Sequence, residues 1–210
     1  MHGSTLNIAL LQLATGQNLE DNWFQLMHWV SQCPKETDLI VLPEVCHFRA
    51  NGSQILLSDY AQSIDGDFIT NVQQLAKELS TAIVIGSFIE SDLDHVYNTS
   101  VFIDEMGQIL GTYRKMHLFD VTVDGHTIQE SKTFTRGKAP CIVNWKGWVV
   151  GLSICYDLRF PELYRYYADH GVDIMLVPSS FTFNTGNRHW HALCRARAIE
   201  NTMYVLAPNQ

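Results

Sequence analysis

Residues 148–163, WVVGLSICYDLRFPEL, join an apolar strand to the start of a helix and place a cysteine, Cys155, at the junction. The continuous apolar run Trp148–Ile154 is typical of a strand that is covered on both faces. Pro161 is favourable in the first turn of a helix, which we expect to span Pro161–Asp169. This strand–turn–helix pattern indicates an α/β protein with a thiol at a strand end.

The rest of the chain repeats the alternation of strand and helix patterns. Short apolar runs predict strands at Leu6–Leu13, Asp38–Leu42, Ala82–Ile89, Val96–Ile103, Gln108–Tyr113, Cys141–Trp145, Val172–Val177 and Met203–Ala207. Helical periodicity predicts helices at Glu20–Gln32, Asp67–Leu79 and His189–Glu200. Residues 116–138 follow neither pattern and are expected to form a polar loop. The alternation favours an α/β fold with a mixed sheet or two sheets.

Length and charge limit the partners. The 210 residues fit one domain, residues 1–210, since domains typically hold about 100–200 residues. The chain has 14 Lys and Arg against 22 Asp and Glu, a net charge of −8, and no basic stripe, which argues against nucleic acid and anionic membranes as partners. No segment approaches the roughly 20 apolar residues of a membrane span. A small molecule or another protein chain is the expected partner.

The cysteines indicate a reducing compartment. They are five in number and widely spaced: Cys33, Cys46, Cys141, Cys155 and Cys194. An odd number without a CxxC pair would leave a thiol unpaired in an oxidising compartment, so we expect a cytoplasmic protein. The N-terminal MHGSTLNIALLQLATG has no cationic start and fits a first strand better than a signal peptide.

Three predicted strand ends carry reactive side chains. Glu44 follows one strand, Lys115 follows another, and Cys155 closes a third. A thiol at a strand-to-helix turn lies near backbone N–H groups that stabilise a thiolate or an oxyanion. Glu44 can serve as the base that the thiol needs, and Lys115 as the cation. Taken alone, each residue is more typical of a non-catalytic role: Cys155 of a buried, inert thiol, Glu44 of a solvated turn carboxylate and Lys115 of a surface amine.

Histidines offer two alternative sites. His117 could form a Cys–His dyad with Cys155, and the sequence leaves this open. A metal site could involve His117, His189 and His191, but the last two lie two residues apart on a predicted helix and so point to different faces. No acidic or cysteine ligand stands at a suitable spacing, and no glycine-rich phosphate loop is present. We therefore expect neither a metal nor a cofactor.

Together, three motifs resemble those of the nitrilase superfamily of carbon–nitrogen hydrolases. They are LPE at Leu42–Glu44, YRKMHLFD at Tyr113–Asp120 and CYDLRFPEL at Cys155–Leu163, in the order that the family has them. The likeness extends from NIALLQL near the start to RARAIEN (Arg195–Asn201) near the end. It implies a four-layer αββα sandwich with mixed sheets, assembled as a homodimer or larger homo-oligomer.

The resemblance also implies a mechanism and roles for five residues. Glu44 would act as general base, Cys155 as nucleophile, and Lys115 with the backbone N–H of Tyr156 would hold the oxyanion. Glu130, in IQESKTF, matches a second glutamate of the family that orients the lysine or steers the amide nitrogen. The alternative for Glu130 is a loop carboxylate paired with a neighbouring lysine.

Within the superfamily, HLFDV, QESKTFTRG, CYDLRFPELYR and TGNRHWHALCRARAIEN are most similar to the branch of omega-amidases and deaminated glutathione amidases. That branch implies hydrolysis of the terminal amide of a small dicarboxylic acid monoamide or of deaminated glutathione. Such substrates carry a carboxylate that arginine suits, and Arg159 and Arg188 are candidates, the latter expected in a loop. The alternative for Arg159 is an ion pair with Glu162 or Asp157.

Other functions remain open on the same residues. The triad also suits nitrile hydrolysis, removal of N-carbamoyl groups or acyl transfer to an amine. A catalytically idle module for dimerisation or partner binding is a further alternative, although all three triad residues are present.

Two departures from the family stand out. The chain ends at Gln210, where family members continue, so we expect it to lack C-terminal strands and a tail; and His191 stands where relatives often have an acidic residue.

Overall fold

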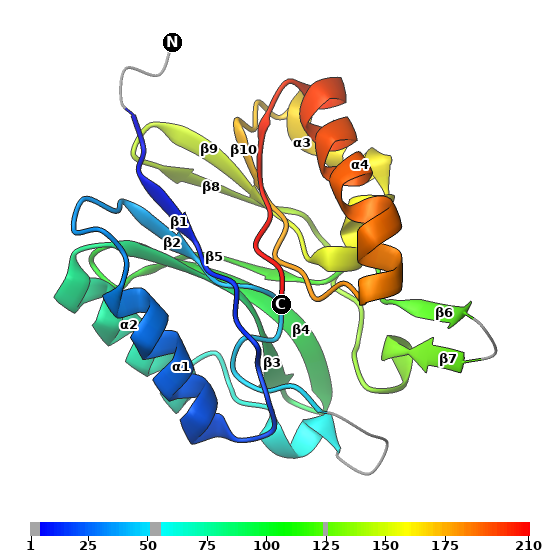
Figure 1. Cartoon of the computed structure of the whole chain (residues 1–210), viewed down its shortest axis with the longest axis horizontal. Helices are drawn as coiled ribbons and strands as arrows, with labels where there is room; N and C mark the ends of the chain where they lie inside the picture. Colours follow the sequence, from blue (N-terminus) through cyan, green and yellow to red (C-terminus); the bar gives the residue numbers. More distant parts are fainter. Residues whose placement is uncertain (1–4, 51–55, 124–125) are drawn as a thin grey trace.

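Two mixed β-sheets lie face to face in the computed structural model, which describes residues 5–50, 56–123 and 126–210 (Figure 1). The first sheet has the order β1 (Ile8–Leu10), β2 (Leu39–Val41), β3 (Ala82–Asp92), β4 (His95–Ile103) and β5 (Ile109–Arg114). The second has the order β11 (Tyr204–Leu206), β10 (Ile174–Leu176), β9 (Trp148–Leu152) and β8 (Cys141–Trp145). In each sheet three strands run parallel, and the hairpins add antiparallel strands.

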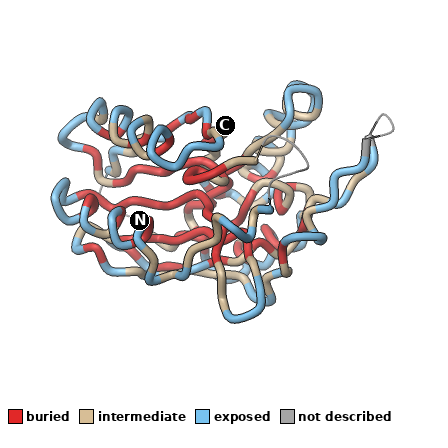
Figure 2. Tube along the Cα trace, turned by 90° about the horizontal axis from the view of Figure 1, so that it is seen from below, coloured by how far each residue is buried: buried red, intermediate tan, exposed pale blue. Residues whose placement is uncertain are grey.

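Among the described residues, four α-helices cover the outer faces of the two sheets. They are α1 (Leu19–Ser31), α2 (Asp67–Leu79), α3 (Pro161–Asp169) and α4 (Phe183–Asn201). The first two pack on the first sheet and the last two on the second. Figure 2 shows the result: buried strands run through the middle, and exposed helical turns lie outside them. This is the αββα sandwich that the resemblance implies. None of these helices, within the described residues, has the length and apolar character of a membrane span.

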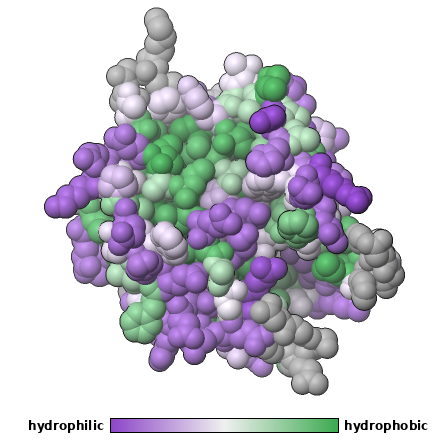
Figure 3. Space-filling model, viewed as in Figure 1, coloured by the Kyte–Doolittle hydropathy of each residue, from purple (hydrophilic) through white to green (hydrophobic). Residues whose placement is uncertain are grey.

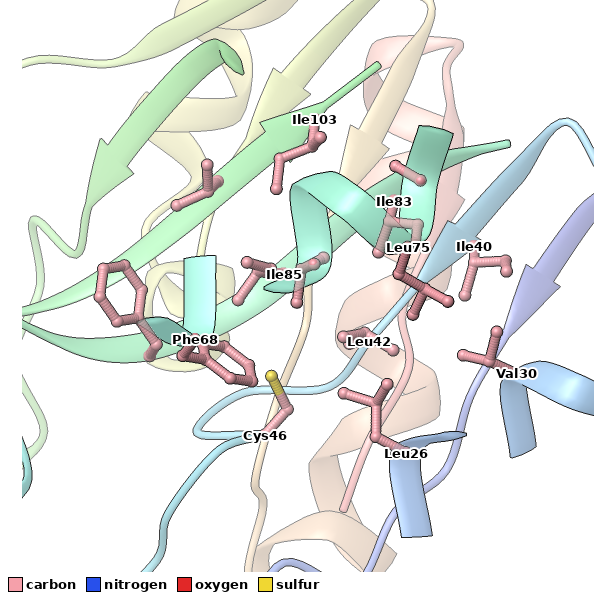
Figure 4. Packing of buried hydrophobic residues seen from close by; sticks show 14 of the residues in the cluster. Leu26, Val30, Ile40, Leu42, Cys46, Phe68, Leu75, Ile83, Ile85 and Ile103 are labelled. Carbon is pink, nitrogen blue, oxygen red and sulfur yellow. The ribbon is translucent and has the colours of Figure 1, made fainter. Parts of the chain in front are cut away.

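Alternation along β2 explains why this strand is apolar throughout. Leu39 and Val41 point into the layer between the sheets, whereas Ile40 and Leu42 point toward α1 and α2 (Figure 4). All four side chains are at most 1% exposed. Burial of one such side chain stabilises the fold by about 1.5–3 kcal/mol. The strand is therefore fixed from both sides, and so is the loop that follows it.

Gly86 in β3 allows the loops behind the site to lie close together. A Cβ at this position would clash with the carbonyl oxygens of Leu42 and Pro43 and would lie 2.6 Å from the Cβ of Pro178. The pairing of β3 with β4 shifts register at this point. Only a residue without a side chain lets the backbones approach this closely.

An apolar area covers one face of the sandwich, over β1 and β11 (Figure 3). These are the edge strands of the two sheets. Leu10 is 44% and Tyr204 64% exposed there. Purple, hydrophilic side chains dominate most of the remaining surface in this view.

Most predicted elements are confirmed. The helices at Asp67–Leu79 and Pro161–Asp169 have the predicted bounds, and every predicted strand is present, several of them shortened at the ends. The polar loop predicted at 116–138 is wrong in part. It contains a hairpin, β6 (Asp120–Val123) and β7 (His126–Gln129), followed by a short 3-10 helix at Glu130–Lys132. This hairpin projects from the body of the molecule (Figure 1). Its strands are not covered on both faces, so they need no continuous apolar run.

The last helix begins six residues earlier than predicted. Thr182 caps it by accepting a hydrogen bond from the N–H of Thr185 at 3.4 Å. Apart from Phe183, which is 85% exposed, the residues of the first turns are polar or glycine, so apolar periodicity gives no signal for them.

Candidate active site

Glu44, Lys115 and Cys155 meet at a cavity of about 350 Å³. Glu44 lies in the loop after β2, Lys115 directly follows β5, and Cys155 begins the 3-10 helix Cys155–Arg159 that follows β9. The site therefore draws on both sheets. The structure brings together the three residues that the sequence predicts at strand ends.

Lys115 is the most deeply buried of the three. Its side chain is 1% exposed, and its Nζ lies 2.9 Å from Glu44 Oε1 and 2.9 Å from Glu130 Oε2. Burial opposes the charged ammonium, but the charges of Glu44 and Glu130 outweigh it and hold the pKa of Lys115 well above its usual range. The side chain is thus a fixed cation inside the cavity.

Glu44 is held by two donors on one oxygen. Its Oε1 accepts from Lys115 Nζ at 2.9 Å and from Asn98 Nδ2 at 3.0 Å. Among the described residues no hydrogen bond reaches Oε2, which leaves this oxygen able to take a proton. The backbone carbonyl of Glu44 accepts from Gln210 Nε2 at 2.7 Å. Sequence reasoning missed Asn98 and Gln210; a polar residue within the apolar strand Val96–Ile103 was the available signal for the first.

Cys155 has an unusual backbone conformation. Its φ of 46° lies in the left-handed region, which a non-glycine residue rarely adopts. The N–H of Cys155 donates to the carbonyl of Pro178 at 2.9 Å, which fixes this turn.

The thiol is kept neutral in the resting site. Burial and the charge of Glu44 raise the pKa of Cys155 well above its usual range, while Lys115 and a backbone hydrogen bond at Ser180 lower it. The raising effects are larger. A nucleophilic thiolate therefore requires transfer of the proton to a base within the cavity.

Asp157 anchors the turn that carries Cys155. It is fully buried and accepts hydrogen bonds from Tyr113 Oη at 2.8 Å and from the N–H of Ile154 at 2.8 Å. His117 Nδ1 lies 2.7 Å from the other Asp157 oxygen.

These contacts decide against the Cys–His dyad in this arrangement. The ring of His117 also stacks on Phe160 with 3.7 Å between centroids, so its position is fixed on Asp157 and Phe160. It does not line the cavity.

Glu130 contacts Lys115, and not one of the lysines next to it in sequence. Both carboxylate oxygens lie within 3.1 Å of Lys115 Nζ. Oε2 also accepts from the N–H of Phe119 at 2.8 Å. The carboxylate thus ties the loop after Lys115 to the ammonium.

Tyr156 lines the cavity beside Cys155. It lies in the first turn of a 3-10 helix, where backbone N–H groups have no partner within the helix. A backbone donor and the ammonium of Lys115 are the groups that an oxyanion requires.

The two arginines differ in position. Arg159 lines the cavity, and its Nη2 lies 3.1 Å from His189 Nδ1. It makes no ion pair with Glu162 or Asp157. Arg188 lies in α4 and is exposed, outside the cavity lining, so its predicted loop position is wrong.

Another arginine lines the cavity. Arg49 is near Phe48 in the loop after β2, and sequence reasoning missed it. Two arginines, Arg49 and Arg159, therefore line the cavity together with Cys155. Within the described ranges, no group of three His, Cys, Asp or Glu side chains is arranged to hold a metal ion.

Comparison with known proteins agrees with this geometry. Residues 7–210 match the carbon-nitrogen hydrolase family. A deaminated glutathione amidase of Synechocystis sp. is 39% identical over 96% of this chain and 76% of its own length. The omega-amidase NIT2 of Mus musculus is 37% identical over 96% of this chain and 73% of its own.

Solved structures share the fold. Nit3 of Saccharomyces cerevisiae, a member of the nitrilase superfamily, superimposes with a TM-score of 0.85 at 28% identity, covering 97% of this chain and 75% of Nit3. The chain thus spans about three quarters of the length of these relatives. The fold, the cavity and these matches show that the chain belongs to the carbon–nitrogen hydrolase family of the nitrilase superfamily.

Proposed function

We propose that this hydrolase cleaves the terminal carboxamide of a small acid with a distal carboxylate, using Cys155 as nucleophile. The observation that carries the proposal is the buried contact of Lys115 with Glu44 in the cavity that also contains the thiol. The substrate would be a dicarboxylic acid monoamide or deaminated glutathione, which are the kinds of compound that the names of its relatives indicate.

In the first half of the reaction, Glu44 takes the thiol proton and the sulfur of Cys155 attacks the amide carbon. The carbonyl oxygen becomes an oxyanion, which Lys115 Nζ and the N–H of Tyr156 stabilise. Glu44 then gives its proton to the amide nitrogen. The C–N bond breaks, ammonia leaves, and a thioester to Cys155 remains.

In the second half, a water molecule replaces the ammonia. Glu44 removes a proton from the water as it attacks the thioester carbon. The same oxyanion donors stabilise the second tetrahedral intermediate. The C–S bond breaks, the carboxylic acid leaves, and Cys155 recovers its proton from Glu44.

The distal carboxylate would be bound by arginine. Arg49 and Arg159 line the cavity, and a guanidinium can bind a carboxylate through two parallel hydrogen bonds. Arg188 has no part in this proposal because it lies outside the cavity.

Ammonia release tests the function. Purified protein would receive succinamate, α-ketoglutaramate and deaminated glutathione in parallel, with Cys155→Ala as the control. Release that is lost in Cys155→Ala supports the proposal and ranks the substrates. No release from any of the three by folded protein would refute it and favour a nitrile or an N-carbamoyl compound, or acyl transfer to an amine. If Cys155→Ala kept every activity and cellular role, the catalytically idle module would be favoured.

A homodimer or larger homo-oligomer in the cytoplasm is part of the proposal. Exposed apolar side chains on the outer helices support self-association: Ile199 on α4 is 78% exposed and Tyr166 on α3 is 41% exposed. All five cysteines are free, which suits a reducing compartment. Light scattering after gel filtration tests the oligomeric state, and the mass of a single chain would contradict the proposed homo-oligomer.

A further inference from the structure

Gln210 connects the two sheets through its side-chain amide. It follows β11 of the second sheet, and in Figure 1 this end of the chain lies beside the segments that follow β1 and β2 of the first sheet. Its Nε2 donates to the carbonyl of Glu44 at 2.7 Å and to Thr15 Oγ1 at 2.8 Å, and its Oε1 accepts from the N–H of Thr15 at 2.9 Å. Both N–H groups and the oxygen are therefore in use, which fixes the orientation of the amide.

The backbone of the same residue is tied to the loop that supports Cys155. The N–H of Gln210 donates to the carbonyl of Ser179 at 3.1 Å. The carbonyl of the preceding residue, Pro178, accepts from the N–H of Cys155 at 2.9 Å. A short path of hydrogen bonds therefore leads from the turn that carries the thiol to Gln210, and from its side chain to the backbone of Glu44.

The donors to the Glu44 carboxylate do not by themselves set its place relative to the thiol. Both of them, Lys115 and Asn98, come from the first sheet, as Glu44 itself does. Cys155 instead follows a strand of the second sheet. Proton transfer between a thiol and a carboxylate requires the two groups to come within hydrogen-bond reach, about 2.6–3.2 Å, in the reacting complex. A link between the sheets next to Glu44 meets that requirement.

We propose that Gln210 is a positioning residue that holds the backbone of Glu44 against the loop supporting Cys155, so that the base stays within reach of the thiol and of the leaving nitrogen. The proposal rests on the amidase function above and adds to it a residue that touches no substrate. Gln210 and Thr15 both lie outside the cavity lining, so the effect passes through Glu44.

Steady-state kinetics with succinamate test this role. Gln210→Met keeps the length of the side chain and removes its hydrogen bonds. We expect kcat to fall by about 10–100-fold, since a small misplacement of a catalytic group has effects of this size. KM should stay within twofold of the wild-type value, because no group that lines the cavity is removed.

An activated ester separates positioning of the base from a general loss of structure. The mono-p-nitrophenyl ester of succinic acid carries the same distal carboxylate, but its leaving group departs without a proton. The amide needs Glu44 twice in forming the thioester, once for the thiol and once for the nitrogen, whereas the ester needs it once. Gln210→Met should therefore slow p-nitrophenol release several times less than ammonia release.

Gln73→Met is the matched control. Gln73 is also half-buried, and its Nε2 donates to the carbonyl of Gly107 at 2.8 Å, remote from the cavity. This variant should keep both activities. If thermal unfolding shows that Gln210→Met is not folded, Thr15→Val takes its place, because it removes the hydroxyl that accepts from Gln210 Nε2. The same pattern with a smaller fall in kcat is expected.

Three results would overturn the proposal: a wild-type kcat in the folded variant, equal slowing of amide and ester, or an equal loss of activity in Gln73→Met. Failure of the underlying function is a separate result, namely wild-type protein that releases no ammonia from the amides. In that case the ester still tests Gln210, because thioester formation on Cys155 should be slower in Gln210→Met than in Gln73→Met.

Discussion

The ammonium of Lys115 and the carboxylate of Glu44 form an ion pair of 2.9 Å in which the side chains are only 1% and 5% exposed. The two residues come from different strand ends of the first sheet, 71 positions apart in the chain. Removing one partner of a buried pair leaves an uncompensated charge, which costs more than the pair itself contributes. In the proposed mechanism, stability and catalysis therefore depend on the same contact.

Lys115→Met should lower both the stability of the fold and the catalytic activity. We expect the free energy of unfolding to fall by about 3–5 kcal/mol, since Glu44 and Glu130 lose their shared cation. Hydrolysis should fall by at least about 10²-fold through loss of the oxyanion donor. Urea denaturation and ammonia release measure the two effects.

Lys146→Met is the matched control. Lys146 lies 3.1 Å from Asp38 in a pair whose side chains are 35% and 26% exposed. An exposed pair contributes at most about 1 kcal/mol, and activity should be unaffected. Equal stability of the two variants would mean that the buried pair has no special role.

Glu44→Gln should separate thiol reactivity from catalysis. The charge of Glu44 raises the pKa of the Cys155 thiol and that of Lys115 lowers it. The glutamine variant should therefore have a larger thiolate fraction and react faster with iodoacetamide at pH 8, while it no longer releases ammonia. Peptide mass spectrometry of Cys155 measures the rate. Slower alkylation than in the wild type would contradict this electrostatic role.

Gly86→Ala should disturb the site from behind. The added methyl would overlap the carbonyl oxygens of Leu42 and Pro43, and Pro43 directly precedes Glu44. Overpacking of this kind costs about 1–3 kcal/mol, and activity should fall with it. Gly16→Ala is the control, because its Cβ would lie 3.8 Å from the nearest atom, Asn22 Oδ1. Thermal unfolding that is unchanged in Gly86→Ala would show that the backbone can adjust.

His47 should make the fold sensitive to acid. Burial lowers its pKa from 6.5 to about 4. The unfolded chain therefore binds a proton at a higher pH than the folded protein does. The contribution of His47 is fully present above about pH 6.5 and is lost as the pH falls toward 4, by roughly 3 kcal/mol in total.

Urea denaturation from pH 7 to pH 4 checks this effect. His47→Gln should show a flatter dependence of stability on pH than the wild type. Replacement of the exposed His191 by glutamine is the control and should keep the wild-type slope. Identical slopes for the wild type and His47→Gln would assign the acid sensitivity to other groups.

Local patterns predict most of the fold. Apolar periodicity alone defines Asp67–Leu79, and a first-turn proline marks the start of Pro161–Asp169. The same reasoning fails where no apolar face is buried. It therefore misses the hairpin in 116–138 and the polar first turns of α4, which in turn misplaces Arg188.

Part of the site is predictable from the sequence, and the reason differs from that for the fold. Glu44, Lys115 and Cys155 stand at strand ends within recognisable motifs, so the sequence points to them. Asn98 and Gln210 act through contacts with Glu44 across 54 and 166 positions of the chain. The local signal at Asn98, a polar residue within an apolar strand, does not identify its partner, and the neighbourhood of Gln210 gives no signal of its contact. Only the packing of the sheets reveals them.

The thioester on Cys155 is the most direct test of the proposed chemistry. Protein that is turning over succinamate would be quenched in acid, digested and examined by mass spectrometry. The mechanism predicts an acyl group on the peptide that contains Cys155, which hydroxylamine removes and which Cys155→Ala lacks. Ammonia release with no acyl group on Cys155, or with one on another cysteine, would contradict it.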